Sequence, residues 1–143
     1  MYNINEYQNI IKERLSDYRF YHSLCVAESA KALAKKYGAD EEKAEVAGIL
    51  HDICKEADLD EQLEIIEKAG MTITEFERNS KKFYHQISGA AYAKVVLGIE
   101  DEEILNAIRQ RNKKEALAVM DKHLSRYLYD KTVIMERYPD YII

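Results

Sequence analysis

The stretch AGILHDICKE, residues 47–56, ends a segment whose apolar residues recur at helical spacing. This spacing predicts a helix that begins after Asp40 and runs to about Cys54. Gly48 lies one turn before Asp52 and removes bulk at a point where a second helix could approach. The stretch therefore predicts a helix that packs closely against a neighbour and carries polar groups at its C-terminal end.

Helical spacing continues on both sides of this stretch. The whole chain contains only 5 Gly and 1 Pro, too few for the turns of a hairpin-rich β fold. The sequence thus predicts one all-α domain, residues 1–143, with about seven or eight helices. The other expected helices span about residues 4–15, 18–37, 59–69, 84–97, 101–109 and 114–129, with a short segment through Phe76 that Thr72 or Thr74 could cap.

Composition and charge exclude several classes of function. The chain has 21 Lys and Arg against 26 Asp and Glu, a formal charge of −5, whereas a general nucleic-acid binder would carry a basic stripe. Apolar residues make up 47% of the chain, enough for a core and too many for a disordered tail. No stretch approaches the ~18 apolar residues that span a bilayer, and the first 15 residues are mixed and charged. We therefore expect a cytoplasmic protein that binds neither membranes nor nucleic-acid polymers.

The two cysteines, Cys25 and Cys54, both lie in apolar helical patterns. We predict two reduced thiols in the core instead of a disulfide, as is usual in the cytoplasm. A thiol buried in a core is a poor nucleophile, so Cys54 is not a candidate for covalent catalysis.

Three of the four histidines, His22, His51 and His85, lie on helical faces with small or apolar residues, and Asp52 directly follows the second of them. Adjacent helical side chains diverge by roughly 100°, so His51 and Asp52 need ligands from another helix to share a site. Imidazole suits Fe, Zn or Mn, and a carboxylate can bridge two ions. Two ions roughly 3.5–4 Å apart can activate water and bind a phosphoryl group. Taken alone, each histidine is more often a hydrogen-bonded core or surface residue.

The order of these motifs resembles the YqeK branch of the HD superfamily of metal-dependent phosphohydrolases, the symmetrical bis(5'-nucleosyl)-tetraphosphatases. The resemblance covers about residues 5–109 and rests on four stretches in the family's order and spacing. These stretches are residues 18–27 around His22, residues 47–56, His85 with residues 88–90, and residues 97–109.

The resemblance implies an HD-domain helical bundle that hydrolyses diadenosine tetraphosphate to two ADP. It also implies a dinuclear divalent metal centre, with iron the expected metal and manganese or zinc the alternatives. In the family pattern His22, His51 and Asp52 would be metal ligands, with Asp52 bridging and taking the catalytic position. His85 would hold the second ion.

Arg19 and Lys55 match charged family positions near the site, and they are candidates for binding the substrate's phosphates. The alternative for both is a solvated helix end, where they would pair with Glu56 or Asp17. The residues themselves leave these two readings open.

The sequence departs from the family pattern after Arg109. The family continues into a Tyr-His-Thr motif and later a Leu-Ala-Asp-Tyr motif, whereas this chain continues with Gln-Arg-Asn at residues 110–112. Either a deletion near residues 109–114 has removed two ligands, or the sequence omits a stretch that is present in the gene. We expect the second. His123 and Asp130 are weak local replacements.

Two alternatives to the hydrolase stay open at this point. One is a non-catalytic nucleotide-binding module that keeps the fold with an incomplete metal site. The other is an HD hydrolase of another nucleotide, such as a guanosine alarmone. A homodimer is a further expectation, with the Tyr- and Ile-rich residues 138–143 as a candidate interface.

Overall fold

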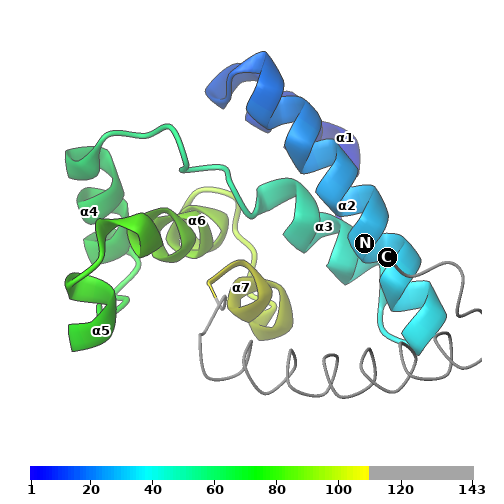
Figure 1. The fold of residues 1–143 in the computed structure, drawn as a ribbon. Coiled ribbons are helices and arrows are strands. Elements are labelled where there is room, and N and C mark those ends of the chain that lie inside the picture. Colours follow the sequence, from blue (N-terminus) through cyan, green and yellow to red (C-terminus); the bar gives the residue numbers. More distant parts are fainter. Residues whose placement is uncertain (110–143) are drawn as a thin grey trace, which may run out of the picture. The chain divides into compact units, whose positions relative to one another are not determined.

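The computed structural model describes residues 1–109, which form one compact unit. All regular structure in this part of the chain is helical, without a strand, as predicted (Figure 1). The helices are α1 (Ile4–Arg14), α2 (Asp17–Tyr37), α3 (Glu41–Leu50), α4 (Leu59–Lys68), α5 (Glu75–Arg78), the 3-10 helix η1 (Lys81–Phe83), α6 (Tyr84–Val95) and α7 (Glu102–Arg109).

Several predictions concern residues outside this range. They are the extent of the domain beyond Arg109, the helix at residues 114–129, the candidates His123 and Asp130, and the interface at residues 138–143. These stay predictions.

Short polar side chains begin most of the helices, where the first backbone N–H groups lack partners within the helix, and α6, which follows Phe83, is an exception. Thr74 caps α5 in a reciprocal arrangement with Glu77, so Thr74 and not Thr72 is the cap. Gly38 ends α2 with a φ of 73°, a left-handed conformation that glycine adopts without strain. The capping side chains, each accepting a hydrogen bond from the backbone N–H three residues later, are those of Asn3, Ser16, Asp40, Asp58, Thr74 and Asp101.

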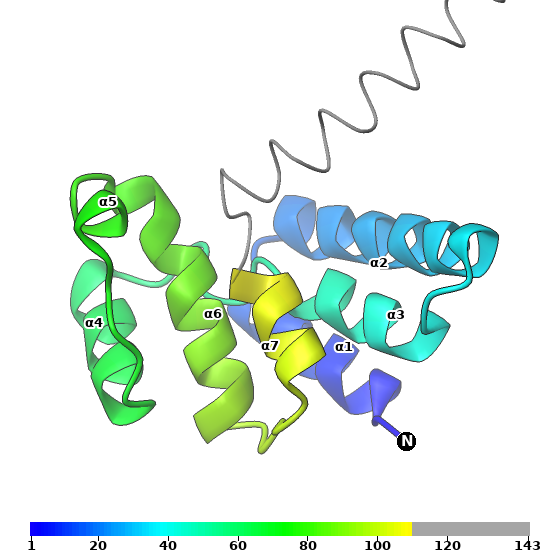
Figure 2. The same cartoon turned by 90° about the horizontal axis from the view of Figure 1, so that it is seen from below.

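The helices pack around two apolar cores. α2 lies along α3, α7 lies between α3 and α6, and α4 packs on α6 (Figures 1 and 2). Residues 51–58 connect α3, in the first core, to α4, in the second. The first core includes Ile11, Val46, Ile49, Leu50, Ile104 and Ile108, and the second consists of Ile66, Tyr84, Ile87 and Ala91.

Gly48 allows α2 and α3 to approach closely, as its position predicts. A Cβ atom built on Gly48 would lie 2.5 Å from the Cα atom of Ala27 and 2.9 Å from its backbone nitrogen. Ala27 and Ser23 are both buried on the side of α2 that faces this contact. Small residues on both helices thus bring the next turn of α2, which carries His22, to the C-terminal end of α3.

The predicted C-terminal end of the third helix is wrong, because α3 ends at Leu50 and not at Cys54. His51 explains the early end, since its Nδ1 donates to the carbonyl oxygen of Gly48 at 2.7 Å. That carbonyl is the one a continuing helix would offer to the N–H of Asp52. Tighter turns follow, in which the N–H groups of Ile53, Lys55 and Ala57 donate to the carbonyls of Leu50, Asp52 and Cys54.

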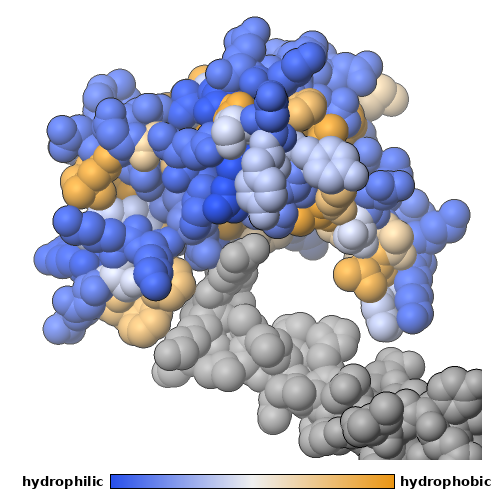
Figure 3. Space-filling model, turned by 45° about the horizontal axis from the view of Figure 1, so that its top comes forward, coloured by the Kyte–Doolittle hydropathy of each residue, from blue (hydrophilic) through white to orange (hydrophobic). Residues whose placement is uncertain are grey.

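The surface of the described residues is largely hydrophilic on the face in Figure 3, where hydrophobic side chains lie in separate areas. Leu33, Phe76 and Val96 are exposed, and they come from α2, α5 and the end of α6. Scattered apolar residues of this kind are normal on a protein surface. Within residues 1–109, no helix combines the length and apolar character that crossing a membrane would require.

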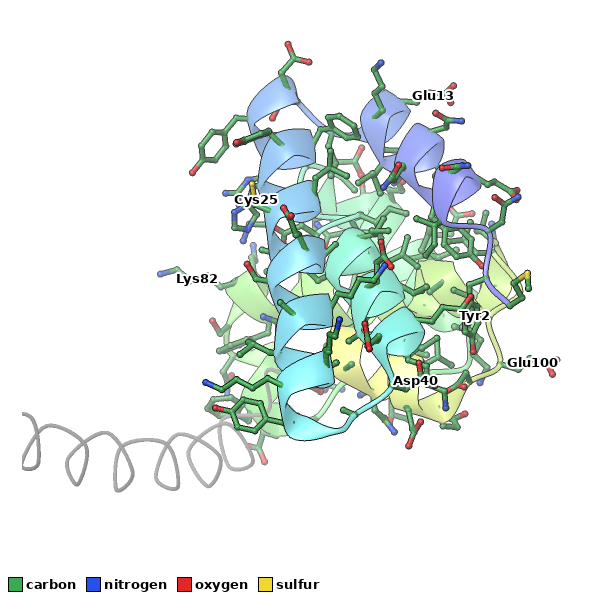
Figure 4. All side chains as sticks on the ribbon, turned by 90° about the vertical axis from the view of Figure 1, so that its right-hand side faces the viewer. Tyr2, Glu13, Cys25, Asp40, Lys82 and Glu100 are labelled. Atoms are coloured by element: carbon green, nitrogen blue, oxygen red, sulfur yellow. The ribbon has the colours of Figure 1, made fainter. Side chains whose placement is uncertain are left out.

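Both cysteines are free thiols, as predicted, but only one of them lies in the core. Cys54 is buried, and burial raises the pKa of its thiol, which suits an inert packing residue. The prediction for Cys25 is wrong, since its side chain projects from α2 on the side away from α1 (Figure 4). The reason is that Ser23 and Ala27 form the buried face of α2, which leaves Cys25 exposed.

Candidate metal centre

The four residues that the sequence analysis proposed as metal ligands meet around one carboxylate. His51 Nε2 lies 3.3 Å from Asp52 Oδ2, and His22 Nε2 lies 3.7 Å from the same oxygen. His85 Nε2 lies 3.5 Å from Asp52 Oδ1. The first residue comes from α2, the pair from the turn after α3, and His85 from the first turn of α6. Three segments that are far apart in the sequence therefore form the cluster. Only His51 and Asp52 are neighbours in the chain.

Arg19 joins this cluster and Lys55 does not. Arg19, in the first turn of α2, donates from a guanidinium nitrogen to Asp52 Oδ2 at 3.2 Å, so its partner is not Asp17. Lys55 is half-buried, and within residues 1–109 its ammonium makes neither an ion pair nor a hydrogen bond, with Glu56 or any other residue. Of the two candidate phosphate-binding cations, only Arg19 is held at the site by the described residues.

Asp52 is ionised at neutral pH despite being only 3% exposed. Burial by itself would raise the pKa of this carboxyl group. The adjoining imidazoles of His51 and His85 and the guanidinium of Arg19 outweigh burial and hold the pKa of Asp52 well below its usual range. Asp52 thus presents an anionic carboxylate with two oxygens in a largely dry setting.

The donor atoms fit a divalent metal ion. Nδ1 of His51 donates to Gly48, so Nε2 is the ring nitrogen available to a metal ion, and it is buried without a hydrogen-bond partner among the described residues. A buried polar atom without a partner costs about 1–3 kcal/mol, which a bound ligand would offset. One ligand atom each from His22, His51 and Asp52 lies within 4.8 Å of the others. Such a mixture of imidazole and carboxylate suits iron, manganese or zinc.

Tyr18 provides an exposed aromatic ring beside the cluster. It is 74% exposed, and its ring lies nearly parallel to that of His22, at 11°, with the centroids 6.5 Å apart. The guanidinium carbon of Arg19 lies 5.7 Å from the centroid of the same ring. Tyr18 was not among the predicted site residues, although its position four residues before His22 on one helix was an available signal.

An all-helical fold with a histidine–aspartate cluster defines the class of this protein. A model of the HD domain matches residues 19–135, and the chain belongs to this family. The chain is 38% identical over 100 residues to a symmetrical bis(5'-nucleosyl)-tetraphosphatase of Halalkalibacterium halodurans, covering 70% of this chain and 53% of that protein. It is 37% identical over 107 residues to the protein of the same name in Staphylococcus aureus, covering 75% and 55%.

The fold is also similar to a crystal structure from Clostridium acetobutylicum, a predicted HD superfamily hydrolase involved in NAD metabolism. The TM-score is 0.69 and the sequence identity 33%, over 76% of this chain and 58% of the other. The chain spans about half the length of the curated relatives that it matches. The family and the fold of this chain are therefore established.

Proposed function

We propose that this protein is a metal-dependent phosphohydrolase that cleaves diadenosine tetraphosphate symmetrically into two ADP. The observation that carries the proposal is the cluster of three imidazoles around the buried carboxylate of Asp52, with an unpartnered nitrogen on His51. The names of the curated relatives support the choice of substrate. The reaction would take place in the cytoplasm.

We further propose that His22, His51, Asp52 and His85 hold a dinuclear divalent metal centre, with iron as the first choice and manganese or zinc as alternatives. When bound, such a centre supplies a hydroxide nucleophile at neutral pH and stabilises charge on the phosphoryl group. The ionised carboxylate of Asp52 has two oxygens and can therefore bridge two ions. The bond from His51 Nδ1 to Gly48 fixes the orientation of the ring, so that Nε2 is the ligand atom.

Phosphate binding falls to Arg19 in this proposal. Its guanidinium has five N–H donors, and the hydrogen bond to Asp52 leaves others for the oxygens of a polyphosphate. Lys55 remains a second candidate cation, but no contact within residues 1–109 supports this role. The buried thiol of Cys54 takes no part, because burial raises its pKa and holds it in the protonated form.

The test is hydrolysis of diadenosine tetraphosphate by the purified chain with Fe(II) or Mn(II) supplied. Anion-exchange chromatography separates the products, and we expect ADP as the sole nucleotide product. Equal amounts of AMP and ATP would contradict symmetrical cleavage. His51→Ala and a sample treated with a chelator serve as controls and are expected to show no turnover.

A non-catalytic nucleotide-binding module is the second candidate. Residues 110–112, Gln-Arg-Asn, stand where the family pattern has a histidine, and this observation favours it. Such a module would bind ADP, hold at most one metal ion per chain and hydrolyse nothing. A parallel assay with a guanosine tetraphosphate would identify the remaining alternative, an HD hydrolase of another nucleotide.

Tyr18 provides a prediction about the base. We propose that its exposed ring stacks on an adenine, since aromatic stacking on a base contributes about 1–3 kcal/mol. Tyr18→Ala is therefore expected to weaken ADP binding about tenfold in isothermal titration calorimetry. Tyr37→Ala is the matched control, because Tyr37 is an exposed tyrosine at the opposite end of the same helix. Equal ADP affinities for the two variants would refute stacking on Tyr18.

A further inference from the structure

The turn after α3 contacts the beginning of α2 through Glu56. The Glu56 carboxylate accepts hydrogen bonds from the backbone N–H of Ser16 at 2.6 Å and from its hydroxyl at 2.7 Å. Ser16 is the N-cap of α2, and its Oγ accepts from the N–H of Arg19 at 3.4 Å. One carboxylate thus binds both hydrogen-bond donors of Ser16, the residue that begins this helix.

The same turn contacts α2 a second time through Asp52, four residues before Glu56. Arg19 donates its side chain to Asp52 and its backbone N–H to Ser16. The contacts therefore close a ring, from Asp52 along the turn to Glu56, across to Ser16, and back through Arg19 to Asp52. Because Arg19 lies in the first turn of α2 and binds Asp52, the position of its guanidinium depends on how that turn is held.

We propose that Glu56 is a positioning residue for phosphate binding, which holds the first turn of α2 through Ser16 and so keeps Arg19 at the metal-binding cluster. The phosphate ligand in this proposal rests on the proposed function. The two hydrogen bonds from Ser16 lower the pKa of Glu56, in keeping with a carboxylate that acts as an ionised acceptor. Among residues 1–109, Glu56 is the acidic residue bound to the cap of the helix that carries Arg19.

A second helix, α5, begins with the same pair of contacts to a glutamate, and it does so without contacting Arg19. Glu77 accepts from the backbone N–H of Thr74 at 2.8 Å and from its hydroxyl at 2.9 Å, at the start of α5. Glu77 contacts Arg109 and none of the clustered residues. Replacing Glu77 therefore removes such a cap, together with the contact to Arg109, and leaves the contacts of Arg19 in place.

The experiment compares Glu56→Gln with Glu77→Gln, in ADP titrations by isothermal calorimetry with Mn(II) present. We expect Glu56→Gln to weaken ADP binding about fivefold, because the amide loses the charge and one of two acceptor oxygens. Glu77→Gln is expected to bind ADP as the original chain does, although both variants should lose some stability in thermal unfolding. Equal ADP affinities for Glu56→Gln and the original chain would overturn the proposal.

A double-mutant cycle shows whether Glu56 acts through Arg19. Arg19→Ala is expected to weaken ADP binding on the order of tenfold, and adding Glu56→Gln should then have no further effect. Additive losses would overturn the proposal. Ser16→Ala tests the relay separately, since it keeps the backbone N–H and removes the hydroxyl, and about a twofold loss is expected.

The outcomes separate this inference from the proposed function. A chain that binds ADP in the predicted pattern but hydrolyses nothing would refute the hydrolase and support the role of Glu56. A chain that hydrolyses diadenosine tetraphosphate with no change in ADP affinity in Arg19→Ala would support the hydrolase and refute the role of Glu56. A chain that binds no ADP would refute the role of Glu56 as well.

Discussion

Replacing Asp52 by asparagine is expected to lower the turnover of diadenosine tetraphosphate by about three orders of magnitude. The amide keeps the shape of the carboxylate but loses the charge that can bind or bridge divalent ions. Metal ions at such a site would supply several kcal/mol of transition-state stabilisation, and each 1.36 kcal/mol is a factor of ten in rate. The chain should stay folded, because the side chain volume is unchanged in a site only 3% exposed.

Two measurements check this result. Metal content after loading with Mn(II), determined by inductively coupled plasma mass spectrometry, should fall in Asp52→Asn and stay unchanged in Asp60→Asn. Asp60 is a matched control because it is an exposed carboxylate in the first turn of α4. Far-UV circular dichroism should be the same for both variants. Full turnover and full metal content in both Asp52→Asn and His51→Ala would refute the site.

Gly48→Ala is expected to lower the free energy of unfolding by about 3 kcal/mol, the upper end of the usual cost of overpacking. The added Cβ would lie 2.5 Å from the Cα atom of Ala27, and a backbone atom cannot rotate away as a side chain can. α2 and α3 would have to separate. Because His22 lies on α2 and His51 directly follows α3, the variant should also bind metal more weakly.

Gly89→Ala is the control for this prediction. A Cβ atom there would lie 3.3 Å from a methyl group of Ile108, a side chain that can shift, and alanine is favoured over glycine in a helix by about 1 kcal/mol. We expect its free energy of unfolding to stay within about 1 kcal/mol of the original value. Urea denaturation of both variants makes the comparison, and a Gly48→Ala variant as stable as the original chain would contradict the close approach of α2 and α3.

Local patterns in the sequence were enough to predict the all-helical fold and most helix ends. These follow from periodic apolar residues and from capping side chains such as those of Asp40 and Thr74, which act on residues three or four positions away. The likeness of the stretches around His22, His51 and His85 to the HD family pattern also indicated which residues meet at the cluster. Their role as metal ligands stays a prediction.

How these residues are held depends on contacts between helices that no local pattern shows. α3 ends at Leu50 because the ring of His51 donates to the carbonyl oxygen of Gly48, which a continuing helix would pair with the backbone N–H of Asp52. Arg19 rather than Lys55 binds Asp52, because the first turn of α2 lies beside the turn that follows α3. The contact between Glu56 and Ser16 joins residues 40 positions apart. No local pattern predicts a contact over that separation, because it depends on how the helices pack.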